Sequence, residues 1–84
     1  YPNPFNPETK IEYYLDRNQK IEISIYNLRG QKIRKLENSV REAGYHSVIW
    51  DGSDNNGRKM PSGIYFTRIS GLDFSDVHKM VMIK

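Results

Sequence analysis

The segment from Asp51 to Gly57 holds the densest group of side chains that could do chemistry. Asp51, Asp54, Asn55 and Asn56 carry hard oxygen atoms of the kind that calcium prefers. Their spacing does not fit an EF-hand loop, because a glycine would be needed where Asn56 stands and no glutamate follows at the twelfth position. The same residue types form tight turns through hydrogen bonds to nearby backbone groups. We therefore predict a turn here, and no metal ligand.

Residues for acid–base or nucleophilic catalysis are sparse. The chain has no cysteine, which excludes disulfides, thiolate nucleophiles and Cys-based zinc sites. Its two histidines, His46 and His78, could be combined with serine and aspartate on paper, but no Gly-x-Ser-x-Gly motif supports a triad. His46 alternates with Val48 and Trp50, as a partly buried strand residue would. We predict no catalytic residue and no cofactor.

A group of basic residues could form a surface that binds an anionic partner. A basic cluster surrounds the turn near Tyr26 and comprises Arg29, Lys32, Arg34 and Lys35. It would suit a nucleic acid, but the interspersed Glu37 and Glu42 and a net charge of only +3 favour a solvated sheet edge.

Exposed tyrosines can stack on sugar rings. Tyr14, Tyr26 and Tyr45 are candidates, although dispersed tyrosines are more typical of half-buried strands. Trp50 is expected in the core.

The elements that would position these residues are short strands. Apolar residues recur with a period of two between glycine and proline punctuation, and nowhere with the period of a helix. Strands are expected over 9–15, 20–27, 31–37, 45–52, 64–70 and 77–84. In the third, Ile33 and Leu36 are out of phase, which predicts a β-bulge. Gly30 is placed for the positive φ of a turn. An all-β, antiparallel sandwich of five to seven strands follows.

The final strand is apolar on both faces near its end. Val77, Val81 and Ile83 share one face with Lys79, whereas Met80 and Met82 share the other with His78. Such a strand is either covered on both sides or presents one side to a partner.

Size and composition indicate one globular domain over residues 1–84. The stiff opening YPNPFNPE, residues 1–8, is interpreted as a proline-rich leader from an upstream passenger. Hydrophobic residues make up 37% and charged residues 27%, as in folded domains, and no apolar run is long enough for a membrane helix.

Four stretches together resemble the type A C-terminal sorting domains of the type IX secretion system: YPNPFNPETKIEY, IYNLRGQKI, AGYHSVIWDGSDNNGRKMPSGIYF and HKMVMIK. The third is also similar to the immunoglobulin-like domain of flagellar hook-capping proteins. The resemblance implies a seven-stranded immunoglobulin-like sandwich that carries an N-terminal passenger through an outer-membrane translocon to the cell surface or medium. It implies translocon and sortase-type components as partners.

The resemblance also implies the recognition residues. The Gly-x-Tyr element falls on Gly63 and Tyr65, and the basic-apolar ending falls on Lys79, Met80, Val81, Met82, Ile83 and Lys84.

The alternative is a structural or carbohydrate-binding accessory module of an extracellular enzyme. Under either function we expect no enzymatic activity, no nucleic-acid partner and no membrane-spanning segment, and a sheet edge through which the chain could dimerise.

Overall fold

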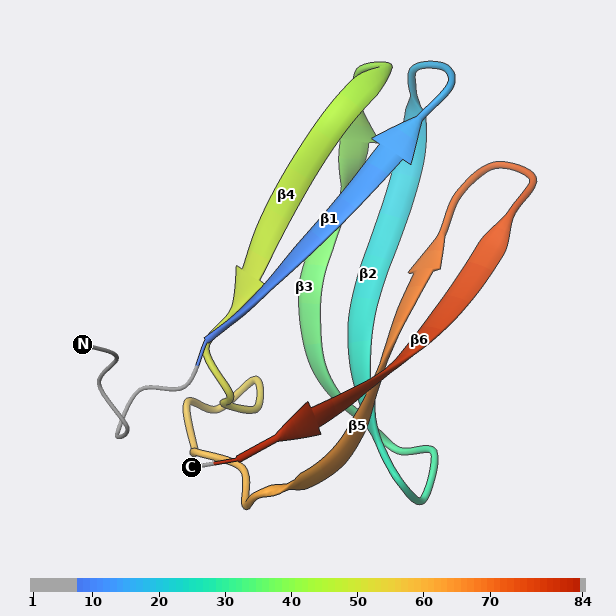
Figure 1. The fold of residues 1–84 in the computed structure, drawn as a ribbon. Coiled ribbons are helices and arrows are strands. Elements are labelled where there is room, and N and C mark those ends of the chain that lie inside the picture. The colour runs from blue at the N-terminus through green and yellow to red at the C-terminus, as the bar shows by residue number, and fades with distance from the viewer. Residues whose placement is uncertain (1–7, 84) are drawn as a thin grey trace.

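The computed structural model describes residues 8–83 and consists of strands joined by turns (Figure 1). Six strands are formed: β1 (Thr9–Leu15), β2 (Gln19–Asn27), β3 (Lys32–Arg41), β4 (Gly44–Trp50), β5 (Gly63–Ser70) and β6 (Ser75–Met82). All paired strands are antiparallel. No helix in this part of the chain is long and apolar enough to cross a membrane. The predicted all-β class is confirmed.

Two sheets of unequal width form the sandwich. β1 and β4 make a two-stranded sheet, and the larger sheet has the strand order β3-β2-β5-β6. Figure 1 shows β1 and β4 as a separate layer in front of β2 and β3. Strands β3 and β6 are therefore the two edge strands, at opposite margins of the larger sheet.

The core lies between the layers and is centred on β2. Ile21, Ile23 and Ile25 alternate along this strand and are at most 1% exposed, as the period of two predicts. Trp50 closes the core from β4, as expected, with 1% of its surface exposed. The full buried set is Ile11, Leu15, Ile21, Ile23, Ile25, Trp50, Tyr65, Ile69 and Met82.

The predicted bulge in β3 is confirmed, and there are two irregular positions. Ile23 pairs with Glu37 and Ser24 with Lys35, so Leu36 is the extra residue at the first. The register shifts again two residues further along β2, between Ile25 and Tyr26, where Ile33 is the extra residue. Each bulge turns an otherwise out-of-phase apolar side chain towards the core, against which both residues pack.

The resemblance implied seven strands, whereas residues 8–83 form six. The stretch between β4 and β5 makes only an isolated bridge, Ser53 to Lys59. Its backbone groups are used in tight turns instead: the amide of Asp54 donates to the Arg58 carbonyl and the amide of Met60 to the Gly52 carbonyl. A chain folded back on itself in this way cannot extend along a neighbouring strand.

Candidate functional site

The two sequence elements assigned to recognition meet in space on β5 and β6. Gly63 pairs with Met82, and Tyr65 pairs with Met80. Antiparallel pairing over the whole of β6 thus joins the Gly-x-Tyr element to the basic-apolar ending.

The alternation of β6 divides the predicted recognition residues into two groups. Met82 is buried at 5% exposure and Met80 packs against the core. Lys79, Val81 and Ile83 are exposed, with Val81 at 64%. The surface on offer to a partner is therefore the face of Lys79 and Val81, together with Val77. Lys84 lies outside the described residues.

Tyr65 belongs to the core rather than to this surface. It is 5% exposed, and its ring meets the edge of the Trp50 ring at a centroid distance of 5.2 Å. The Tyr65 hydroxyl donates to the Pro61 carbonyl at 2.6 Å. Burial raises the pKa of Tyr65. The tyrosine of the Gly-x-Tyr element therefore packs into the core and anchors the start of β5.

The outward face of β5 and β6 combines apolar and basic side chains. The register crosses the larger sheet in the row Lys32, Tyr26, Phe66 and Lys79. Lys32 is held by Glu22 at 2.8 Å, whereas the Lys79 ammonium makes no hydrogen bond or ion pair with residues 8–83. Phe66 and Arg68 were not predicted from the sequence, although their alternation with the buried Tyr65, Thr67 and Ile69 is a signal for outward positions.

The segment 51–57 forms the predicted turn, and its oxygen atoms accept protein hydrogen bonds. Asp54 Oδ1 accepts the amides of Asn56 and Arg58, both at 2.9 Å. Asn55 Oδ1 accepts the amide of Lys35 on β3 at 3.0 Å. The side chains that suggested calcium thus shape the loop and fasten it to β3. Residues 8–83 contain no group of three or more His, Cys, Asp or Glu side chains placed to hold a metal.

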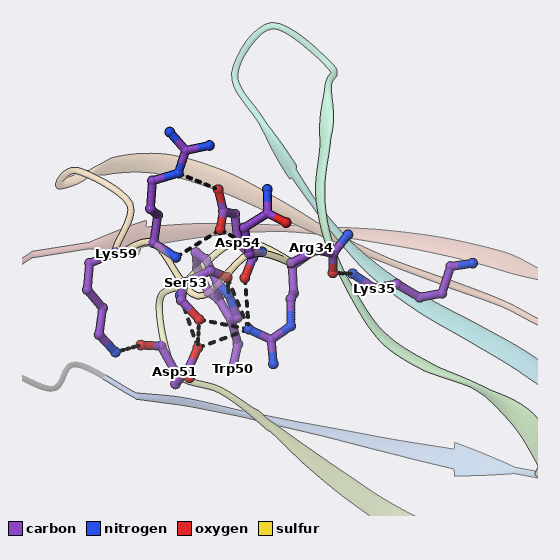
Figure 2. A network of polar contacts seen from close by, with 10 residues as sticks. Arg34, Lys35, Trp50, Asp51, Ser53, Asp54 and Lys59 are labelled. Atoms are coloured by element: carbon purple, nitrogen blue, oxygen red, sulfur yellow. Dashed lines mark hydrogen bonds and ion pairs between the residues drawn. The ribbon is translucent and has the colours of Figure 1, made fainter.

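Arg34 joins this loop to the larger sheet (Figure 2). Its Nη1 donates to Ser53 Oγ at 2.8 Å, to Asp51 Oδ1 at 3.3 Å and to the Ser53 carbonyl at 3.3 Å. The Trp50 indole donates to the same carbonyl at 2.9 Å. The network therefore links β3 directly to the end of β4.

Asp51 is the acidic centre of the network. Hydrogen bonds from the Ser53 hydroxyl and amide hold the pKa of Asp51 below its usual value, and the Arg34 guanidinium adds to this. The Asp51 carboxylate is therefore used in contacts that hold the loop in place.

The histidines lie on different sheets. His46 on β4 stacks on Tyr13 at 5.3 Å, and its Nε2 lies 2.6 Å from the Glu42 carbonyl. His78 on β6 lines an open hollow of about 220 Å³ between β1 and β5, next to Met80 and Ile69. No hydrogen bond within residues 8–83 joins either histidine to a serine.

The candidate tyrosines differ in exposure. Tyr45 is 87% exposed and Tyr14 is 59% exposed. Their ring centroids lie 4.9 Å apart on the outer face of the smaller sheet. Tyr26 is half-buried beside Lys32. The basic cluster is likewise divided, because Arg34 is taken into the loop network and Lys32 into its ion pair with Glu22.

Comparison with known proteins assigns the fold. The chain is an immunoglobulin-like β-sandwich domain. The sequence profile of the FlgD Ig-like domain matches residues 6–73, and the chain belongs to that family. This is the relation that the segment AGYHSVIWDGSDNNGRKMPSGIYF indicated. No curated protein sequence matches the chain.

Two solved structures have the same fold. FlgD from P. aeruginosa superimposes with a TM-score of 0.72 at 21% identity, over 89% of this chain and 59% of that chain. FlgD from Xanthomonas campestris, described in connection with hook capping and flagellar assembly, gives a TM-score of 0.70 at 23% identity, over 90% and 56%. The chain thus spans less than two thirds of either relative.

Proposed function

We propose that this chain is a non-catalytic accessory module that holds a neighbouring protein, and that the exposed face and free edge of β6 are its contact surface. Within residues 8–83, β6 pairs with β5 on one side only. Every second residue of such a margin strand directs its N–H and C=O groups away from the sheet. This unpaired margin, bordered by Val77 and Val81, is the observation that carries the proposal.

The family assignment supports a structural role. The matched family is defined as the immunoglobulin-like domain of FlgD, and one relative is described in connection with hook capping. A module that fits against other proteins needs a stable sandwich and an accessible surface, and needs no enclosed reaction pocket.

Site-specific photo-crosslinking in the cells that produce the protein tests this function. A photoreactive residue in place of Val81 should give a discrete protein adduct. The same residue in place of Val40, which is 70% exposed on β3, should give little. Equal yields at the two positions, or turnover of a substrate by the purified chain, would contradict the proposal.

The type IX sorting function is the second candidate. Its partners would be the outer-membrane translocon and sortase-type components, and its destination the cell surface or medium. It is favoured by one observation: three of the ending residues, Lys79, Val81 and Ile83, are exposed beside a free sheet margin.

Surface substitutions separate the two candidates better than truncation, because removing β6 would also remove Met82 from the core. The double variant Lys79→Glu/Val81→Thr changes exposed side chains only. A sorting signal predicts that the full-length protein carrying it is retained in the cell. Undiminished export of this variant, while a photoreactive residue in place of Val81 in the otherwise unchanged chain still gives its adduct, would instead leave the structural role alone standing.

A further inference from the structure

The margins of the larger sheet are not equivalent. At β3, the loop residue Asn55 donates its amide to the Ile33 carbonyl and accepts the Lys35 amide. These bonds, and the two bulges, occupy or distort that margin. β6 instead pairs without a register shift from Ser75 to Met82. A long, regular margin of this kind can template another strand.

The outward side chains beside this margin have a defined pattern. Along β6, Lys79 stands between Val77 and Val81, which are 60% and 64% exposed. Behind Lys79 lies Phe66, and Arg68 lies behind Val77. The outward residues of the two strands are Ile64, Phe66, Arg68, Ser70, Ser75, Val77, Lys79 and Val81, with two cations and no carboxylate.

We propose that β6 binds an extended strand of a partner protein in which an acidic side chain, flanked at alternate positions by apolar ones, lies opposite Lys79. This inference rests on the proposed function and names the chemistry of the partner. Side chains on one face of neighbouring strands lie close enough to interact whichever way the added strand runs. An apolar–acidic–apolar stripe would therefore meet Val77, Lys79 and Val81 in turn.

Charge and backbone chemistry together favour a polypeptide over other anionic polymers. A basic face alone would attract any of them. An extended polypeptide also supplies N–H and C=O groups at the spacing of the free groups along β6. Moreover, the Lys32 nitrogen lies over the Tyr26 ring, 5.9 Å from its centroid, so a stacking base or sugar would have to displace this side chain.

Three peptides test the inference on the 84-residue chain. The first carries valine, aspartate and valine at alternate positions of a threonine-rich strand, and the second has lysine in place of aspartate. The third has the composition of the first with the aspartate moved by one residue, which turns it to the opposite face. Amide NMR titration of β6 measures the affinity for each.

The first peptide should bind about twofold to fivefold more tightly than the other two, as expected for a cross-strand charge pair. Lys79→Glu should reverse the preference between aspartate and lysine. The matched control Lys35→Glu changes the same charge on the β3 side of the sheet and should leave the preference unchanged. Both positions are exposed, and unaltered Trp50 fluorescence would verify folding.

Equal affinities for the three peptides, an unchanged preference in Lys79→Glu, or no binding at ~1 mM peptide would overturn the inference. These results are distinguishable from failure of the proposed function. A Val81 adduct that persists in cells while the peptides show no acidic preference would keep the accessory role and reject this partner chemistry.

Discussion

Arg34 links β3 to the loop that follows β4 through side-chain hydrogen bonds. The chain has no cysteine, so no disulfide fastens one sheet to the other as in antibody domains. Arg34 extends from β3 to Asp51 and Ser53, directly after the buried Trp50. Guanidinium groups suit this role because several N–H donors lie in a fixed plane.

Replacing Arg34 tests the strength of this link. Arg34→Met keeps much of the apolar stem but removes the donors to Ser53 and Asp51, so we expect a loss of about 1–3 kcal/mol in the free energy of unfolding. Urea unfolding followed by Trp50 fluorescence measures it. Lys35→Met, at the exposed neighbouring position, should change stability by no more than about 0.5 kcal/mol. Equal effects of the two substitutions would show that the network is unimportant.

Asp51 should make the domain sensitive to acid. Its pKa in the folded state is lowered from 3.8, first by the Ser53 hydrogen bond. A lowered carboxyl pKa means that the stabilisation is complete above the unfolded-state value and is lost as pH falls through the folded-state value. The free energy of unfolding should therefore decrease below about pH 4.

The acid sensitivity should be smaller in Asp51→Asn, which is measured by urea unfolding at several pH values between neutral and pH 2. Part of the sensitivity should remain, because the pKa values of Glu22 and Glu37 are also lowered, chiefly by Lys32 and Arg41. A variant with the same pH profile as the original chain would exclude Asp51 as a contributor.

At the scale of elements, the β2–β3 hairpin depends on its turn. The Gly30 amide donates to the Asn27 carbonyl at 3.0 Å, and Gly30 has a φ of 82°. Asn27 Oδ1 accepts the amides of Arg29 and Gln31, both at 3.0 Å. The turn fixes which residues of β3 lie opposite β2, and hence where the bulges place Leu36 and Ile33.

A side chain with a branched Cβ should disturb this turn. Nothing lies within 4 Å of a Cβ built on Gly30, so any cost is conformational rather than steric. Gly30→Val should lower the free energy of unfolding by about 1–2 kcal/mol, and Gly30→Asn by clearly less, since asparagine tolerates positive φ. Thermal unfolding of both variants decides the matter. Equal losses would contradict a conformational cause.

At the scale of the whole molecule, a four-stranded sheet is covered by only two strands. The best-buried residues consequently lie where the layers overlap, along β2, while β5 and β6 extend to a margin with exposed Val77 and Val81. A domain of this size hides only about 60% of the surface of its unfolded chain. Its stability should thus be concentrated in a small central region.

Shortening one buried and one exposed side chain tests whether stability is concentrated in this central region. Ile23 is 0% exposed, and Ile23→Val should lower the free energy of unfolding by about 1 kcal/mol. Val40→Ala removes apolar atoms from a position that is 70% exposed and should cost less than about 0.5 kcal/mol. Chemical unfolding that ranked Val40→Ala above Ile23→Val would refute a core centred on β2.

Local patterns predicted the elements well, because they report on backbone conformation and on which face is buried. The alternation of Ile21, Ile23 and Ile25 predicted β2, and the phase slip at Leu36 predicted a bulge. The resemblance implied seven strands, whereas residues 8–83 form six, and the polar segment after Trp50 forms turns, as its residue types predicted.

What the sequence by itself determined is the all-β class, the inward position of Trp50 and the two-faced character of the ending. Only the tertiary structure decided which face of the ending is free: Met80 and Met82 pack inward, while Lys79 and Val81 remain outside on a margin strand. The tertiary structure also pairs Arg34, which the sequence placed in a basic cluster, with Asp51. The physical reason is that periodicity records how a strand alternates, whereas exposure and partners depend on strands distant in the chain.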